Sequence, residues 1–111
     1  MMNGITPSVD GRLINNYHGN LVNLFYKILP MRENDEASLP VYIDNLKCEL
    51  IGCRRLMEQA DFDPYYLSLI AILQYLLEMP DCDVQMTKRQ VFKAISICKK
   101  LKSMYWEEAD E

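Results

Sequence analysis

The stretch 61–79 reads DFDPYYLSLIAILQYLLEM, and it decides the fold. Asp63 followed by Pro64 is typical of a helix start, because aspartate caps the first turn and proline is tolerated at the first helical position. In the fifteen residues after Pro64, only one serine, one glutamine and one glutamate are polar. The run is shorter than the roughly 20 apolar residues that a membrane-spanning helix needs. It therefore predicts a largely buried helix over 64–79.

Apolar residues recur at intervals of three and four through the rest of the chain, with no sustained alternation of period two. This pattern is typical of amphipathic helices. A first helix is expected over 12–29, with Pro30 just beyond its end. A second is expected over 39–60, where Ser38 is the cap and Pro40 lies in the first turn.

The last helix is expected to follow Thr87, because Thr87 and Gln90 have the spacing of a capping box. Only two or three residues separate the second helix from the third, so these two should fold back as an antiparallel pair. We therefore predict an all-α fold, a single-domain antiparallel four-helix bundle over residues 1–111. Its helices are predicted at 12–29, 39–60, 64–79 and 88–106, with flexible ends at 1–11 and 107–111.

The composition agrees with a small folded domain. The 111 residues, with a mass of 13.0 kDa, are half hydrophobic and one quarter charged. This balance argues against a disordered tail, a collagen-like fibre or a low-complexity linker. The net charge of −4 and the pI near 5.0 argue against a wholly basic nucleic-acid coat. The helical phases predict that five side chains lie deep in the core: Leu46, Leu50, Ile70, Leu73 and Ile95.

The four cysteines, Cys48, Cys53, Cys82 and Cys98, form no Cys-x-x-Cys pair. Cys48 and Cys53 are five residues apart, about 140° around a helix, and cannot chelate one ion together. We expect reduced thiols that act as small hydrophobic residues, with no metal and no cofactor. The alternative is a zinc site in which His18 is a further candidate ligand.

The first residues, MMNGITP, show no cationic run before an apolar stretch and no small-residue cleavage pattern. We therefore expect a cytoplasmic protein rather than a secreted one. No apolar stretch is long enough to span a membrane, so we expect no membrane contact.

The residue types that enzymes need do not form a recognisable catalytic pattern. His18 is the only histidine, and the sequence contains neither a Gly-rich phosphate loop nor a His-Glu-x-x-His or Glu-x-x-His motif. The paired acids Asp61 and Asp63, and Asp81 and Asp83, fall at predicted helix ends, where capping explains them. We expect that the protein is not an enzyme.

One stripe of the helix at 64–79 is less polar than the outer face of a bundle helix usually is. We interpret it as a surface for another protein or for self-association, with Tyr75 and one of Tyr65 or Tyr66 as aromatic anchors. In the alternative interpretation, segment 1–11 or the loop after Pro30 covers this stripe. The candidate partner-binding residues are Tyr65, Ser68, Ala71, Ile72, Tyr75 and Glu78.

The basic residues are concentrated near the end of the chain. Residues 1–86 carry a net charge of −6, whereas 88–106 contain six basic and no acidic side chains. Such a set could bind the phosphates of a polyanion, although a merely solvated face is the preferred interpretation because the rest of the chain is acidic. The helix at 64–79 has no Lys or Arg, which disfavours a helix-turn-helix. The candidate polyanion-binding residues are Lys88, Arg89, Lys93, Lys99, Lys100 and Lys102.

Together these features predict a small, non-catalytic regulatory protein that acts through protein–protein contact. An adaptor, an inhibitor, an immunity-type protein or a regulatory subunit would fit, and a homodimer is the self-associating form. The alternative is a nucleic-acid-binding regulator that uses the basic face of the last helix.

Overall fold

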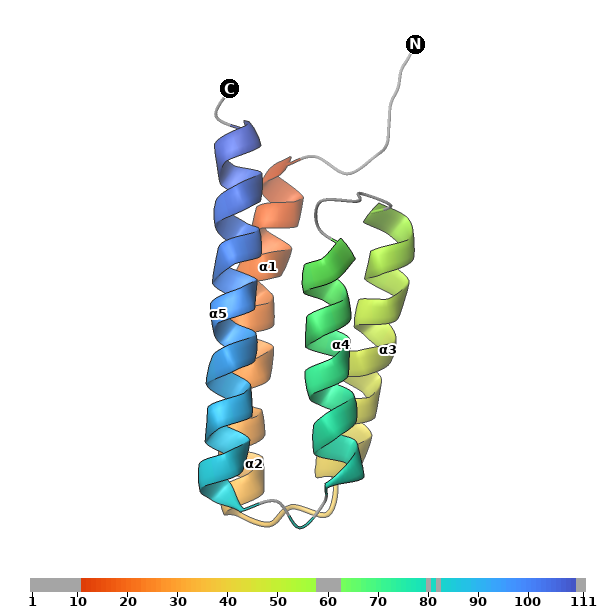
Figure 1. Ribbon diagram of the computed structural model, residues 1–111, viewed down its shortest axis with the longest axis vertical. Helices are drawn as coiled ribbons and strands as arrows, with labels where there is room; N and C mark the ends of the chain where they lie inside the picture. The colour runs from red at the N-terminus through yellow and green to blue at the C-terminus, as the bar shows by residue number, and fades with distance from the viewer. Residues whose placement is uncertain (1–10, 58–62, 80, 82, 110–111) are drawn as a thin grey trace.

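The computed structural model describes residues 11–57, 63–79, 81 and 83–109. They form α1 (Gly11–Tyr26), α2 (Ile28–Glu33), α3 (Leu39–Met57), α4 (Asp63–Glu78) and α5 (Val84–Ala109). Because α2 continues α1 beyond Lys27, the five segments make four rods (Figure 1). The prediction of an all-α antiparallel four-helix bundle is confirmed. None of the described helices is long and apolar enough to cross a membrane.

The four rods are arranged as two pairs (Figure 1). The first pair is α1 with α5, which run side by side, and the second is the α3–α4 hairpin. The pairs meet where α4 contacts α5 and where α2 contacts α3. One long flank of α4 therefore lies next to α3 and the other lies next to α5.

The core contains side chains from all five helical segments. The buried hydrophobic residues are Leu21, Phe25, Ile28, Leu39, Ile43, Leu46, Leu50, Tyr66, Leu69, Ile72, Leu73, Leu76, Val91, Ala94, Ile95, Cys98 and Leu101.

Four of the five predicted core residues are confirmed as buried, namely Leu46, Leu50, Leu73 and Ile95. The prediction for Ile70 is wrong, since it is only partly buried against the core. Its neighbour Leu69 points inward, and the next residue of a helix is rotated by about 100° from it.

Pro30 does not end the first helix, so the predicted boundary at 29 is wrong. Proline has no N–H to donate to the carbonyl of Tyr26, and the hydrogen-bond ladder is interrupted at Lys27. The amide of Met31 still donates to the carbonyl of Lys27 at 3.4 Å, and that of Asn34 donates to the carbonyl of Pro30 at 2.9 Å. The chain is therefore helical again as far as Glu33, in α2.

The last helix begins four residues earlier than predicted, because Asp83 caps it. The amide of Met86 donates to Oδ1 of Asp83 at 2.8 Å, and the hydroxyl of Thr87 donates to the main-chain oxygen of Asp83 at 2.9 Å. Thr87 is buried inside the helix. The predicted capping box of Thr87 and Gln90 is therefore wrong, whereas the capping role of Asp83 is confirmed.

The ends of the predicted segments also differ from the observed ones. Helix α5 continues to Ala109, and α1 begins at Gly11, so parts of both predicted flexible ends are helical. The remainder of those ends, and the predicted helical residues 58–60, lie outside the described residues.

Replacing Asp83 with alanine is expected to lower the free energy of unfolding by about 1 kcal/mol, because the first turn of α5 loses its side-chain acceptor. Asp81 is an exposed aspartate outside the helices and serves as the matched control. Asp81→Ala should change stability by less than about 0.5 kcal/mol. Urea denaturation of the two variants checks the difference, and equal effects would contradict the capping role.

Candidate functional site

The outward side of α4 is exposed and contains apolar residues. Ser68, Ala71 and Glu78 are exposed, as predicted, and Tyr65 and Tyr75 are partly buried against the core. Leu67 is 45 % exposed and lies one turn before Ala71 on the same side of the helix. Apart from Glu78 near the end of the helix, this part of the bundle surface therefore consists of small, aliphatic and aromatic side chains rather than charged ones.

The structure changes two members of the predicted partner-binding set. Ile72 is only 6 % exposed and belongs to the core, so its place on an exposed surface is wrong. Leu67 flanks the predicted stripe without being one of the six candidates, and it is one of the most exposed large apolar side chains of the described chain. Its spacing of four from Ala71 places it on the exposed side of the helix rather than at the edge of the stripe.

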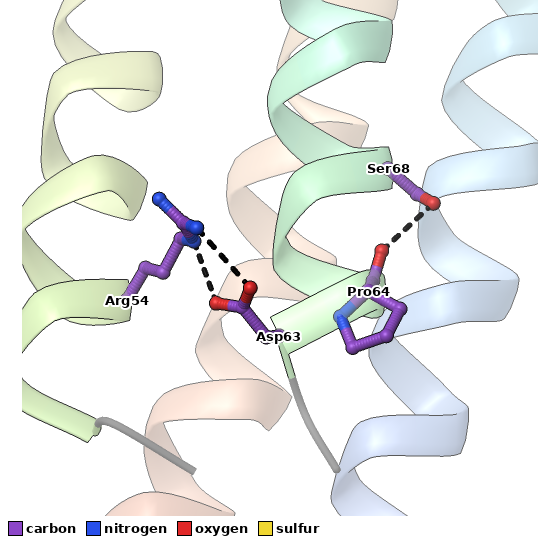
Figure 2. Close-up of polar contacts among 4 residues, drawn as sticks. All are labelled: Arg54, Asp63, Pro64 and Ser68. Atoms are coloured by element: carbon purple, nitrogen blue, oxygen red, sulfur yellow. Dashed lines mark hydrogen bonds and ion pairs between the residues drawn. The ribbon is translucent and has the colours of Figure 1, made fainter. Parts of the chain in front are cut away.

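Polar side chains on the α3 flank of α4 are paired with each other. Nζ of Lys47 donates to Oε1 of Gln74 at 2.7 Å, and Nε2 of Gln74 donates to Oε2 of Glu78 at 2.9 Å. Nearer the start of α4, the guanidinium of Arg54 binds both carboxylate oxygens of Asp63, at 2.6 and 3.1 Å (Figure 2). The Lys47–Gln74 and Arg54–Asp63 contacts link the two helices of the α3–α4 hairpin, and the second pairs opposite charges.

Ser68 also uses its hydroxyl within the helix. Its Oγ donates to the carbonyl of Pro64 at 2.9 Å (Figure 2). This back-bond satisfies the hydroxyl donor and explains how a serine is accommodated in the exposed part of α4. Ser68 therefore contributes a small contact surface rather than an unsatisfied donor.

On the other flank, α4 meets the basic residues of α5. Nζ of Lys100 lies 5.7 Å from the centroid of the Tyr65 ring, within the range of a cation–π contact. The two helices are antiparallel, and Lys93 is two turns before Lys100. Lys93 therefore lies about two turns further along α4, near the level of Ile72.

The six basic residues of α5 do not form a single ridge. Lys88, Phe92 and Lys99 make one row, at spacings of four and seven, and Phe92 contacts the ring of Tyr26 in α1 edge-on. Arg89, Lys93 and Lys100 make the neighbouring row with the same spacings, on the side of Tyr65.

Lys102 belongs to the α1 side as well, because a Cβ added at Gly19 would lie 3.5 Å from its Nζ. All six basic side chains are exposed, and the contact with α4 is made by Lys100, a member of the row that also contains Arg89 and Lys93. The predicted basic surface is thus divided between two sides of α5.

His18 lies in a buried polar cluster between the two helix pairs. Its Nε2 is 2.5 Å from the hydroxyl of Tyr66, and neither residue is appreciably exposed. The adjacent residue is Tyr17, whose hydroxyl donates to Oε2 of Glu49 at 3.2 Å. Cys53 is within hydrogen-bonding reach of both tyrosines. The cluster therefore connects α1 to α3 and α4.

Burial keeps His18, Tyr17 and Cys53 uncharged at pH 7. It lowers the pKa of His18 to about 4 and raises the pKa of the Tyr17 hydroxyl, and the nearby Cys53 and Glu49 raise the latter further. Burial also raises the pKa of the Cys53 thiol, although hydrogen bonds from the two tyrosines oppose this. The histidine is thus an uncharged hydrogen-bonding partner, and the thiol is protonated.

The other cysteines lie apart from this cluster. Cys98 is buried in the core, where burial raises its pKa to about 12, and Cys48 is exposed on α3. Cys82 lies outside the described residues. Within the described part of the chain, no group of three or more histidine, cysteine or acidic side chains is arranged to hold a metal ion.

A cavity of about 330 Å³ lies at the end of the bundle where α2 joins α3. Its floor includes Leu39, Ile43 and Leu76, and its rim carries Arg32 and Glu36. Charges of both signs therefore surround this hollow, in contrast to the uniformly positive row of α5 beside α4.

No protein-family model, curated protein or solved structure matches this chain. The function is therefore argued from the side chains. The described residues form an apolar and aromatic surface on α4, a positive row on α5 beside it, and a hydrogen-bonded cluster around the buried His18 and Tyr66.

Proposed function

We propose that this is a small, non-catalytic helical protein that regulates another protein by binding it through the exposed side of α4. The observation that carries the proposal is the exposure of Leu67 and Ala71 between the partly buried rings of Tyr65 and Tyr75. Apolar residues with aromatic anchors are typical of the centre of protein interfaces. Both rings pack against the core, so little conformational freedom is lost when a partner covers them.

This mode of action suits an adaptor, an inhibitor, an immunity-type protein or a regulatory subunit, and self-association would use the same surface. We also place the protein in the cytoplasm. Cys98 fills part of the core as a thiol, and Cys48 and Cys53 are free thiols too, the state that reducing compartments maintain.

The proposal predicts that Leu67→Arg abolishes partner binding without unfolding the protein, because Leu67 is on the surface. Tagged wild-type and variant proteins are used to capture partners from the cells that produce them, and the recovered proteins are quantified by mass spectrometry. At least about a tenfold loss is expected for specific partners, which corresponds to about 1.4 kcal/mol.

Val41→Arg is the matched control, because Val41 is 62 % exposed on α3, away from the outward side of α4. It should retain the partners. If both variants lose them equally, capture reflects general surface stickiness. If neither loses them, the α4 surface is not the binding site.

A second candidate function, binding of nucleic acid, rests on the six exposed basic residues of α5. Lys88, Arg89, Lys93 and Lys99 make no ion pair within the described residues. A mobility shift with DNA or RNA that weakens steeply with salt would favour this function. The absence of any shift at low salt would eliminate it.

A further inference from the structure

We propose that the partner presents an amphipathic α-helix with acidic residues along one edge, and that this helix lies along both α4 and the adjoining row of α5. The inference rests on the proposed function and specifies the chemistry of the partner. The α4–α5 surface is defined by these residues: Tyr65, Leu67, Ser68, Ala71 and Tyr75 from α4, and Arg89, Lys93 and Lys100 from α5.

The contact between Lys100 and Tyr65 links the α4 part of this surface to the α5 part. It places the cation at the edge of the apolar side of α4, near the start of that helix. Because α4 and α5 are antiparallel, Lys93 and then Arg89 follow along the same edge toward the end of α4. A partner that covers Ala71 and Tyr75 therefore comes close to this positive row.

The positive charge of the row of Arg89, Lys93 and Lys100 favours a partner that carries acidic side chains. Arg89 and Lys93 have no ion pair in the part of the chain that the structure describes, and no acidic residue occurs between Val84 and Trp106. The opposite flank differs, since Lys47 and Arg54 are bound by residues of the α3–α4 hairpin. By charge complementarity, the acidic side chains of the partner helix should lie along the edge that faces α5 and not along the edge that faces α3.

The geometry favours a helix over an extended strand. Both α4 and α5 use their main-chain groups within their own helices, so they offer no free edge for strand addition. A partner held only through side chains must satisfy its own backbone, as a helix does. The exposed residues of α4 recur every three or four positions, a spacing that an antiparallel or parallel helix matches turn by turn.

The probes for the test are two helical peptides of roughly 18 residues, long enough for five turns. Both carry leucines at helical spacing on one side, and one has glutamates and the other lysines along the edge beside the leucines. Binding to the full chain is measured by fluorescence anisotropy at about 50 and about 300 mM NaCl. The glutamate peptide is expected to bind at least about tenfold more tightly than the lysine peptide at low salt.

Two charge-reversal variants locate the effect. Lys93→Glu with Lys100→Glu should abolish or invert the preference for the glutamate peptide. Lys88→Glu with Lys99→Glu makes the same change in net charge on the α1 side of α5 and should leave the preference within about twofold. Circular dichroism verifies that both variants are folded, which is expected because all four lysines are exposed.

The outcomes separate this inference from the proposed function. Equal binding of the two peptides, or equal effects of the two charge-reversal variants, would overturn the inference that the partner has an acidic edge. Loss of binding in Leu67→Arg would still support the α4 surface as the binding site. If neither peptide binds while partners captured from cells depend on Leu67, the partner is not such a helix. Displacement of the peptide by an oligonucleotide would assign the surface to nucleic acid and overturn the inference. A homodimer that dissociates in the Lys93→Glu, Lys100→Glu variant would assign it to a second copy of the chain, and this too would overturn the inference.

Discussion

Replacing Phe25 with alanine lowers the free energy of unfolding by about 3 to 5 kcal/mol, the range for removal of a buried phenylalanine. Phe25 lies in α1 with no exposed surface, in the same core as Leu21 and Ile28. Its removal costs the transfer free energy of the ring and leaves a cavity that rigid neighbouring helices cannot fill. Urea denaturation measures the effect, and a similar dependence on urea concentration would show that the folded state remains compact.

Phe92 provides the matched control on α5. It is 44 % exposed and packs edge-on with another partly exposed ring, that of Tyr26, with 6.2 Å between the centroids. Phe92→Ala should therefore cost about 1 kcal/mol. If the two alanine variants are equally stable, Phe25 does not occupy the core.

The second large effect is a loss of stability in mild acid caused by His18. An unfolded histidine, with a pKa near 6.5, takes up a proton as the pH falls below that value. In the folded protein, burial holds the pKa of His18 at about 4, so the native state remains unprotonated. The unfolded state binds more protons between these two values, and stability therefore falls as the pH decreases. The expected loss between pH 7 and pH 5 is about 2 kcal/mol.

Two variants test whether His18 is the cause. His18→Gln should be less stable at pH 7 but should lose about 2 kcal/mol less between pH 7 and pH 5 than the wild type does. Tyr66→Phe should keep the pH dependence, because burial rather than the Tyr66 hydroxyl lowers the histidine pKa. Tyr17 and Cys53 do not contribute in this range, since burial raises both of their pKa values. A wild type and a His18→Gln variant with the same pH dependence would contradict the prediction.

The periodicity of apolar residues was sufficient to predict the helices and most of the core. Leu50 and Leu73 are buried because they repeat in phase with their neighbours, and a pattern of this kind can be recognised in the sequence alone. The helix boundaries are harder to predict from the sequence. Pro30 lies within a helical segment because only one main-chain bond is lost there, and Asp83 caps the last helix ahead of the equally plausible Thr87.

The candidate site was predicted only in part, for a related reason. Helical spacing predicts that Ser68 and Ala71 lie outside, but it does not show how α4 packs against the other helices, and the predicted surface position of Ile72 is therefore wrong. Nor does the sequence indicate that Lys100 lies beside Tyr65, since their proximity depends on how the two helix pairs pack. The burial of His18 against Tyr66 depends on the same tertiary arrangement.

The pairing of α1 with α5 has a consequence for how the chain folds as it is synthesised. The α3–α4 hairpin has its partner within a short stretch of sequence and can form as soon as α4 leaves the ribosome. By contrast, α1 is made first and must wait for the last helix before its apolar side chains are covered. A transcript truncated within α5 would therefore yield a chain with an exposed first helix, which chaperones and proteases would recognise.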